Sequence, residues 1–279
     1  TLALIKMSRI IFIFLVLTST QLCAQLISVP TGEVEVFKSL GIKYSNCTLE
    51  IEQFEISNQV TVKEYLQFLK AIKSTVPDSV YLGLVPKASN LPPSLYSEFL
   101  NSSIFLDVPV VGVDWLQAMA YCKWKTFQEY ELDTSSYGLY RLPKLSEWLY
   151  AKGFTAANDS IIPFEDGPSE WTYNAKAFRL DTIAELFDYS YPAEIIDPPS
   201  LKRKIVIGNS WYSTEETLYE HTHKDRFQNV GYGDIGFRIL KRMQSDSSIY
   251  KKATEIGYPL YPTEYWIKKE WGLPLKTEN

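Results

Sequence analysis

Aromatic side chains set the strongest constraint on the fold of this chain. They make up 14% of its 279 residues, with 19 Tyr, 14 Phe and 7 Trp against 3 Met and 2 His. Large amphipathic rings at this density are typical of a loop-rich fold held by aromatic packing, and less typical of an aliphatic helical bundle. With 3 Cys and 2 His, the chain also has few ligands for a zinc site or an iron–sulfur cluster.

The N-terminus has the layout of a secretory signal peptide. Lys6 and Arg9 precede an apolar run at residues 10–17, and small or polar residues lead to a cleavage site after Ala24. We expect residues 1–24 to be removed on export; an uncleaved anchor or a buried strand is the alternative. The apolar run is shorter than the ~20 residues of a membrane-spanning helix, so no transmembrane span is expected after cleavage. Lipid attachment at Cys23 stays open.

Charge argues against nucleic acid as a partner. Loss of Lys6 and Arg9 with the signal peptide changes the formal net charge from −5 to −7, and the longest basic run is Lys202–Lys204. An acidic chain without a basic stretch is poorly suited to nucleic acid or an anionic membrane surface. Cys47 and Cys122 remain in the mature chain; they either form a disulfide, or Cys122 is a small buried apolar residue.

Three helices are predicted from start signals. Thr61–Glu64 and Asp114–Gln117 are capping boxes, each followed by an apolar face. A third helix follows Pro143, buries Trp148 and is expected to end at Gly153 in a left-handed cap.

Strands are predicted at residues 49–56, 205–207 and 236–240, where Gly236 would permit a close approach of two backbones. Residues 74–108 and 158–200 are rich in Pro, Ser and Asn and are expected to form surface loops. No internal repeat is visible, so we predict a single domain.

Four sequence blocks, read in order, resemble the formylglycine-generating enzyme family, also called the sulfatase-modifying-factor family. They are FEISNQVT (54–61), PVVGVDWLQAMAYCKW (109–124), YRLPKLSEWLYA (140–151), and the pair GNSW (208–211) and IGFR (235–238). The resemblance implies an α+β, loop-rich fold of the formylglycine-generating-enzyme type, similar to C-type lectins. It would occupy residues 25–242, followed by an aromatic-rich extension at residues 243–279.

The resemblance also locates the catalytic cysteines of the family. They follow the GGSW motif, bind copper and activate oxygen to oxidise a substrate cysteine to formylglycine. Here Ser213 and Leu218 occupy the two positions, and neither supplies the thiolate that copper(I) requires. We therefore expect a non-catalytic member without copper, although another enzymatic activity in the same cleft remains the alternative.

Four residues are candidates for the binding cleft: Ser210, Trp211, His221 and His223. The alternative enzyme would use His221 and His223 in the same cleft. Two imidazoles with one residue between them can bind one metal ion, but the acidic residues around them favour a solvated loop over a metal site.

The resemblance further implies a calcium site, with Asp166 and Glu170 as candidate ligands, because calcium prefers oxygen donors. A turn with a structural glutamate is the alternative. Arg141, Glu147 and Trp148 are expected to be structural, with Glu147 as the partner of Arg141.

The sequence thus suggests an exported binding or structural module, periplasmic or associated with the outer membrane or cell surface. Relatives with this domain occur among gliding-motility lipoproteins of the bacterial envelope, so an envelope protein or a glycan is the expected partner. The extension carries Tyr258, Tyr261, Tyr265, Trp266 and Trp271. These rings either brace the domain or form a docking surface.

Overall fold

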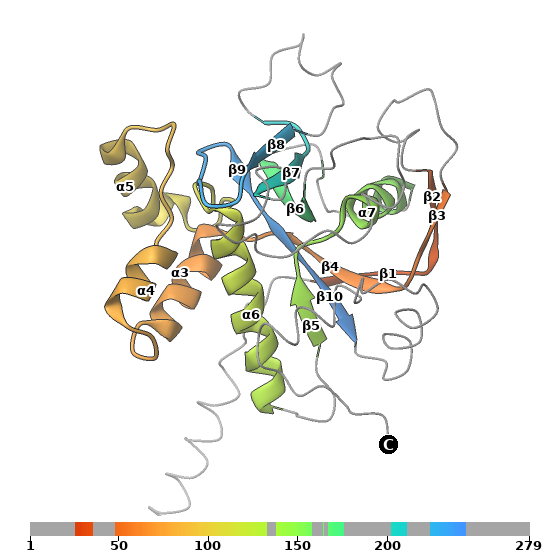
Figure 1. Ribbon diagram of the computed structural model, residues 1–279, viewed down its shortest axis with the longest axis horizontal. Helices are drawn as coiled ribbons and strands as arrows, with labels where there is room; N and C mark the ends of the chain where they lie inside the picture. Colours follow the sequence, from red (N-terminus) through yellow and green to blue (C-terminus); the bar gives the residue numbers. More distant parts are fainter. Residues whose placement is uncertain are drawn as a thin grey trace, which may run out of the picture.

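The structure is a computed structural model of the 279-residue chain, and it combines helices with short sheets (Figure 1). It describes residues 26–35, 48–132, 138–157, 164, 167–175, 202–210 and 224–243. The predicted signal peptide, residues 244–279 of the predicted C-terminal extension, Cys23 and Cys47 lie outside these ranges.

The central sheet has four strands in the order β1-β4-β10-β5, with every neighbouring pair antiparallel. Its strands are β1 (Leu26–Val29), β4 (Phe54–Gln59), β10 (Arg238–Met243) and β5 (Gly138–Arg141). A two-stranded sheet of β2 (Gly32–Glu35) and β3 (Thr48–Ile51) packs beside α7 (Leu145–Ala157).

A third sheet has the order β8-β7-β6-β9. It comprises β8 (Lys224–Phe227), β7 (Arg203–Ile207), β6 (Ser169–Ala175) and β9 (Ile235–Gly236). Gly236 pairs with Glu170 in this sheet, and two residues later Arg238 pairs with Gln59 in the central sheet. The chain therefore passes from one sheet to the other at Phe237, along the long blue strand at the centre of Figure 1.

Gly236 is needed at this crossing because of close backbone contact. A Cβ atom there would lie 2.8 Å from the carbonyl oxygen of Val110 and 3.3 Å from Cγ of Pro168. The close approach predicted from the sequence is thus confirmed.

Both predicted capping boxes are present. Thr61 and Glu64 exchange the reciprocal bonds that begin α3 (Val62–Ile72). At the start of α6 (Trp115–Leu132), the Gln117 amide donates to Asp114 Oδ1 at 2.8 Å, and the Asp114 amide donates to Gln117 Oε1 at 2.9 Å. Two of the unpaired N–H groups at each helix start are satisfied in this way.

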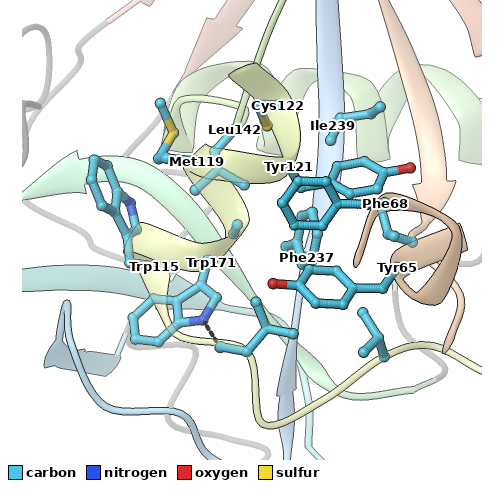
Figure 2. Close-up of a cluster of buried hydrophobic side chains, with 14 of the residues drawn as sticks. Tyr65, Phe68, Trp115, Met119, Tyr121, Cys122, Leu142, Trp171, Phe237 and Ile239 are labelled. Atoms are coloured by element: carbon cyan, nitrogen blue, oxygen red, sulfur yellow. Dashed lines mark hydrogen bonds between the residues drawn. The ribbon is translucent and has the colours of Figure 1, made fainter. Parts of the chain in front are cut away.

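Aromatic rings form the main core between α3, α6 and the sheets. Tyr65, Phe68 and Tyr121 contact one another in edge and stacked arrangements, and the rings of Tyr65 and Tyr121 also make edge contacts with Phe237 (Figure 2). Trp171 donates its indole N–H to the Val113 carbonyl at 2.8 Å, the dashed line in Figure 2. The rings thus supply packing and also satisfy buried backbone acceptors.

Three expectations are wrong. Residues 74–108 are not merely loops: they contain α4 (Asp78–Leu84), α5 (Pro93–Asn101) and the 3-10 turn η1 (Ser103–Phe105). The loop predicted for residues 158–200 contains β6, all seven of whose residues are buried. Gly153 lies inside α7, which continues to Ala157, and it is not among the described glycines with positive φ.

Candidate functional site

The candidate site lies at the end of β7, where the GNSW block turns out of the sheet. Gly208 has a φ of +90°, in the left-handed region that glycine adopts readily. Its carbonyl accepts a hydrogen bond from Ser169 Oγ at 3.0 Å. The turn is thereby fixed against the first residue of β6.

Ser210 follows this turn and is 6% exposed. Its hydroxyl donates to Asp234 Oδ2 at 2.9 Å, while the Asp234 carbonyl accepts from the Ser169 amide at 2.9 Å. The predicted site residue Ser210 therefore joins two loops through a carboxylate. Trp211, Ser213, Leu218, His221 and His223 lie outside the described residues.

Glu170, a candidate calcium ligand, lies behind this turn at the centre of four hydrogen bonds. Arg238 donates from Nε to Oε2 at 2.5 Å and from its NH2 nitrogen to Oε1 at 2.6 Å. Trp148 donates to Oε2 at 2.9 Å and Gln59 to Oε1 at 2.7 Å. Both carboxylate oxygens are thus engaged by protein donors.

Arg238 is held from the other side as well. Its guanidinium lies 3.9 Å from the ring centre of Phe164, and its NH1 nitrogen donates to the Ser57 carbonyl at 3.2 Å. A buried charge costs several kcal/mol unless it is paired and hydrogen-bonded. Glu170 and Arg238 meet that requirement together, which favours the structural role of Glu170. Asp166, the other candidate ligand, lies outside the described residues.

Arg141 and Glu147 form a second buried ion pair. The NH1 and NH2 nitrogens of Arg141 each lie 2.7 Å from one oxygen of Glu147, the fork-to-fork geometry of a bidentate pair. Glu147 also accepts the Lys144 amide at 2.7 Å at the start of α7, and NH2 of Arg242 at 3.2 Å. Glu147 is the partner of Arg141 that was predicted from the sequence, and the short separation of the two residues along the chain made that prediction possible.

The pKa of Glu147 reflects this environment. Burial alone would raise it, but Arg141, with help from Arg242 and Lys144, outweighs burial and holds the pKa well below its usual range. Glu147 therefore stays ionised, and it is unsuited to act as a proton donor near neutral pH.

Asp114 is a functional candidate that sequence reasoning treated only as a helix cap. Burial raises its pKa to about 6, although hydrogen bonds from the amides of Gln117 and Leu116 oppose the shift. Perturbed carboxylates can mark functional sites. Here, however, Gln117 donates to the carbonyls of Gly83 and Val85 at 2.9 and 3.2 Å, so the cap joins α6 to α4.

Cys122 is buried and unpaired in the core (Figure 2). Burial raises the pKa of its thiol well above the ordinary value, and the thiol form is neither a copper ligand nor a nucleophile. The prediction that Cys122 behaves as a small buried apolar residue is confirmed.

No metal-binding cluster appears in the part of the chain that the structure describes: no three His, Cys, Asp or Glu side chains gather there in a suitable group. Within the same residues, no helix is long and apolar enough to cross a lipid bilayer.

Comparison with known proteins identifies one family. The model of the sulfatase-modifying factor enzyme 1-like domain matches residues 15–179, more than half of the chain. The GNSW and IGFR blocks lie beyond this match. No curated protein sequence matches the chain.

Three solved structures align with most of the chain. The crystal structure of CarF is 16% identical and covers 80% of this chain and 100% of its own, with a TM-score of 0.49. Treponema denticola variable protein 1 is 15% identical over 78% and 94% of the two chains, with a TM-score of 0.46. PvdO from Pseudomonas aeruginosa is 16% identical over 79% and 95%, with a TM-score of 0.43.

Proposed function

The chain belongs to the sulfatase-modifying factor enzyme 1-like domain family, and on that premise we propose that it is a non-catalytic member of this family that is exported to the bacterial envelope. Its role is that of a binding or structural module. The partner is an envelope protein or a glycan, and the product is periplasmic or associated with the outer membrane or cell surface.

The positions of the cysteines carry this proposal. All three precede the GNSW block, at Cys23, Cys47 and Cys122. Cys122 is buried with a raised thiol pKa, and the positions expected for the catalytic pair are Ser213 and Leu218. Hydroxyl and aliphatic side chains do not fit copper(I), which requires soft thiolates. Formylglycine generation by the mechanism of the family is therefore not supported.

The charged residues of the described core support a structural role. The pairs Arg238–Glu170 and Arg141–Glu147 are each almost fully buried and bidentate. Charges fixed in this way stabilise one arrangement of the loops rather than a reacting group. A calcium ion does not fit at Glu170, because the Arg238 guanidinium already occupies both oxygens of that carboxylate.

The alternative is another enzyme that uses the same cleft. Among the described residues its support is the Ser210–Asp234 hydrogen bond, which places a hydroxyl against a carboxylate. The imidazoles of His221 and His223 would have to complete the site. This function requires that replacement of either histidine by Ala abolish an activity of the full chain, whereas the binding module retains its partner after the same change.

Export is tested by expressing the full chain in a bacterial host and separating its compartments. The proposal predicts an envelope-associated product whose intact mass corresponds to a chain that begins at Gln25. Replacing residues 10–17 by a polar sequence should leave the protein in the cytoplasm at full length. A wild-type product that stays cytoplasmic and unprocessed would contradict the proposal.

A further inference from the structure

The β2–β3 hairpin has an acidic outer face. Glu33 and Glu50 are directly opposite each other in the antiparallel register, and both side chains are exposed. Like charges at opposed positions destabilise a strand pair. Neither carboxylate has an ion-pair partner among the described residues, so a cation supplied from outside would relieve this repulsion.

The hairpin presents this face outward because its other face is apolar. Val34, Leu49 and Ile51 are 7%, 7% and 6% exposed and belong to the core cluster that includes Leu149 of α7. Side chains alternate between the two faces of a strand. Burial of the apolar face therefore fixes Glu33 and Glu50 on the solvent side.

The edge strand β8 carries the opposite charge. β8 is the outermost strand of its sheet. Lys224 and Arg226 lie two residues apart, hence on one face, and both are half-buried. In the described part of the chain neither forms an ion pair with a carboxylate. Arg226 instead donates to the Asp225 carbonyl at 3.0 Å and lies 5.4 Å from the Tyr232 ring centre.

The two surfaces are opposite in charge but lie on different parts of one copy. Lys224 and Arg226 are roughly 7 Å apart along β8, and Glu33 and Glu50 are opposed across the strand pair at roughly 5 Å. Figure 1 shows β8 at the top of the molecule and the β2–β3 hairpin at its right edge. The complementary partner that this protein itself supplies is the hairpin of a second copy.

We propose that the chain associates with itself head to tail, with the Glu33 and Glu50 carboxylates of one copy against Lys224 and Arg226 of the next. Such a contact uses two different surfaces and does not close as a dimer, so association continues beyond two copies. Exposed ion pairs are individually weak and screened by salt. The association is therefore reversible and strongest at low ionic strength. It does not depend on the proposed function.

Sedimentation equilibrium of the full chain tests this proposal. At ~50 mM salt the weight-average mass should exceed that of one chain, and at ~0.5 M salt it should fall to that of one chain. Glu33→Lys with Glu50→Lys should weaken association by about tenfold or more, because like charges then face each other. Lys224→Glu with Arg226→Glu should do the same. An equimolar mixture of the two variants should associate again at low salt, with the two variants alternating, because each hairpin then faces a β8 of opposite charge on the other variant.

Matched controls separate this contact from overall charge. Lys70→Glu with Lys87→Glu changes the net charge by the same amount as Lys224→Glu with Arg226→Glu, at exposed positions in α3 and in the segment that follows α4, and should leave association unchanged. Circular dichroism checks that each variant is folded; Glu33→Gln with Glu50→Gln replaces the reversal if it does not fold. A wild-type chain that is monomeric at low salt, or reversed variants that fail to pair when mixed, would overturn the proposal. Binding of an anionic polysaccharide by a monomeric wild type would also overturn it.

Discussion

Arg238 and Glu170 are 68 positions apart in the sequence and share two hydrogen bonds of 2.5 and 2.6 Å, with side chains 0% and 1% exposed. This pair connects β10 of the central sheet to β6 of the third sheet. Since Trp148 and Gln59 donate to the same carboxylate, one side chain joins four elements of the domain.

Glu170→Gln tests this connection. The amide keeps the shape of the side chain but removes its charge, so Arg238 loses its counter-charge. The NH₂ group of the amide would also face side chains that are themselves donors. Removing one partner of a buried pair typically costs ~3–5 kcal/mol. Chemical denaturation should show a loss of this order. Calcium should not raise the melting temperature of the wild type, because protein donors already occupy the Glu170 carboxylate. A calcium-dependent rise would instead support the predicted calcium site.

Arg141→Ala should be destabilising by a similar amount, about 3 kcal/mol or more, since Glu147 remains buried without its main partner. Arg203→Ala is the matched control. Arg203 pairs with Asp225, but their side chains are 30% and 18% exposed, and half-exposed pairs contribute about 1 kcal/mol or less. Equal losses in the two variants would show that Arg141 is not a buried anchor.

These two ion pairs illustrate what the sequence could predict. Glu147 is six positions from Arg141 and at the third position of its helix, so local spacing sufficed to pair them. Glu170 and Arg238 are brought together by the pairing of β6 with β9. No local pattern in the sequence predicts such a contact between distant strands. The family resemblance placed Arg238 in the IGFR block and Glu170 in a candidate calcium site, without indicating that the two residues meet.

The helices, too, could be predicted only where the sequence carries a local signal. α3 and α6 begin with reciprocal side-chain caps and were predicted from them. α4 and α5 begin after Pro77 and Pro92 without a side-chain cap, and α4 buries none of its residues. Without a side-chain cap to mark their starts, the proline-rich composition pointed to loops. The candidate cleft depended on the family resemblance, because the sequence from Ser210 to His223 has no helix or strand periodicity.

Asp114→Asn should remove the loss of stability that comes from burying a charged carboxylate at higher pH. The folded-state pKa of about 6 lies above the ordinary 3.8, so the folded protein holds the proton more tightly, and stability falls as pH rises between these values. Asn caps helices as well as Asp does. The variant should equal the wild type near pH 4 and exceed it by roughly 1–3 kcal/mol at pH 8. Denaturation curves at both pH values measure the difference.

Asp78→Asn supplies the control for that titration, because Asp78 is exposed at the start of α4. Its effect should be small, with no comparable gain in stability at pH 8. A constant difference between Asp114→Asn and wild type across the range would contradict the burial of the Asp114 charge.

Gly236→Ala should lower stability by about 1–3 kcal/mol, as overpacking does, because the new methyl group would lie 2.8 Å from the Val110 carbonyl oxygen. Gly153→Ala is the opposite case. No atom lies within 4 Å of its added Cβ, and alanine favours a helix interior by up to ~1 kcal/mol. Melting temperatures should move in opposite directions; a loss at Gly153 would indicate that α7 does not continue past that residue.

The absence of copper-dependent oxidation tests the central claim most directly. The mature chain is incubated with copper, oxygen, a reductant and a cysteine-containing sulfatase peptide, with an active formylglycine-generating enzyme as the positive control, and the peptide mass is measured. Because Ser213 and Leu218 supply no thiolate, we predict that the peptide keeps its cysteine while the control converts it. Conversion of that cysteine to formylglycine by this chain would contradict the account.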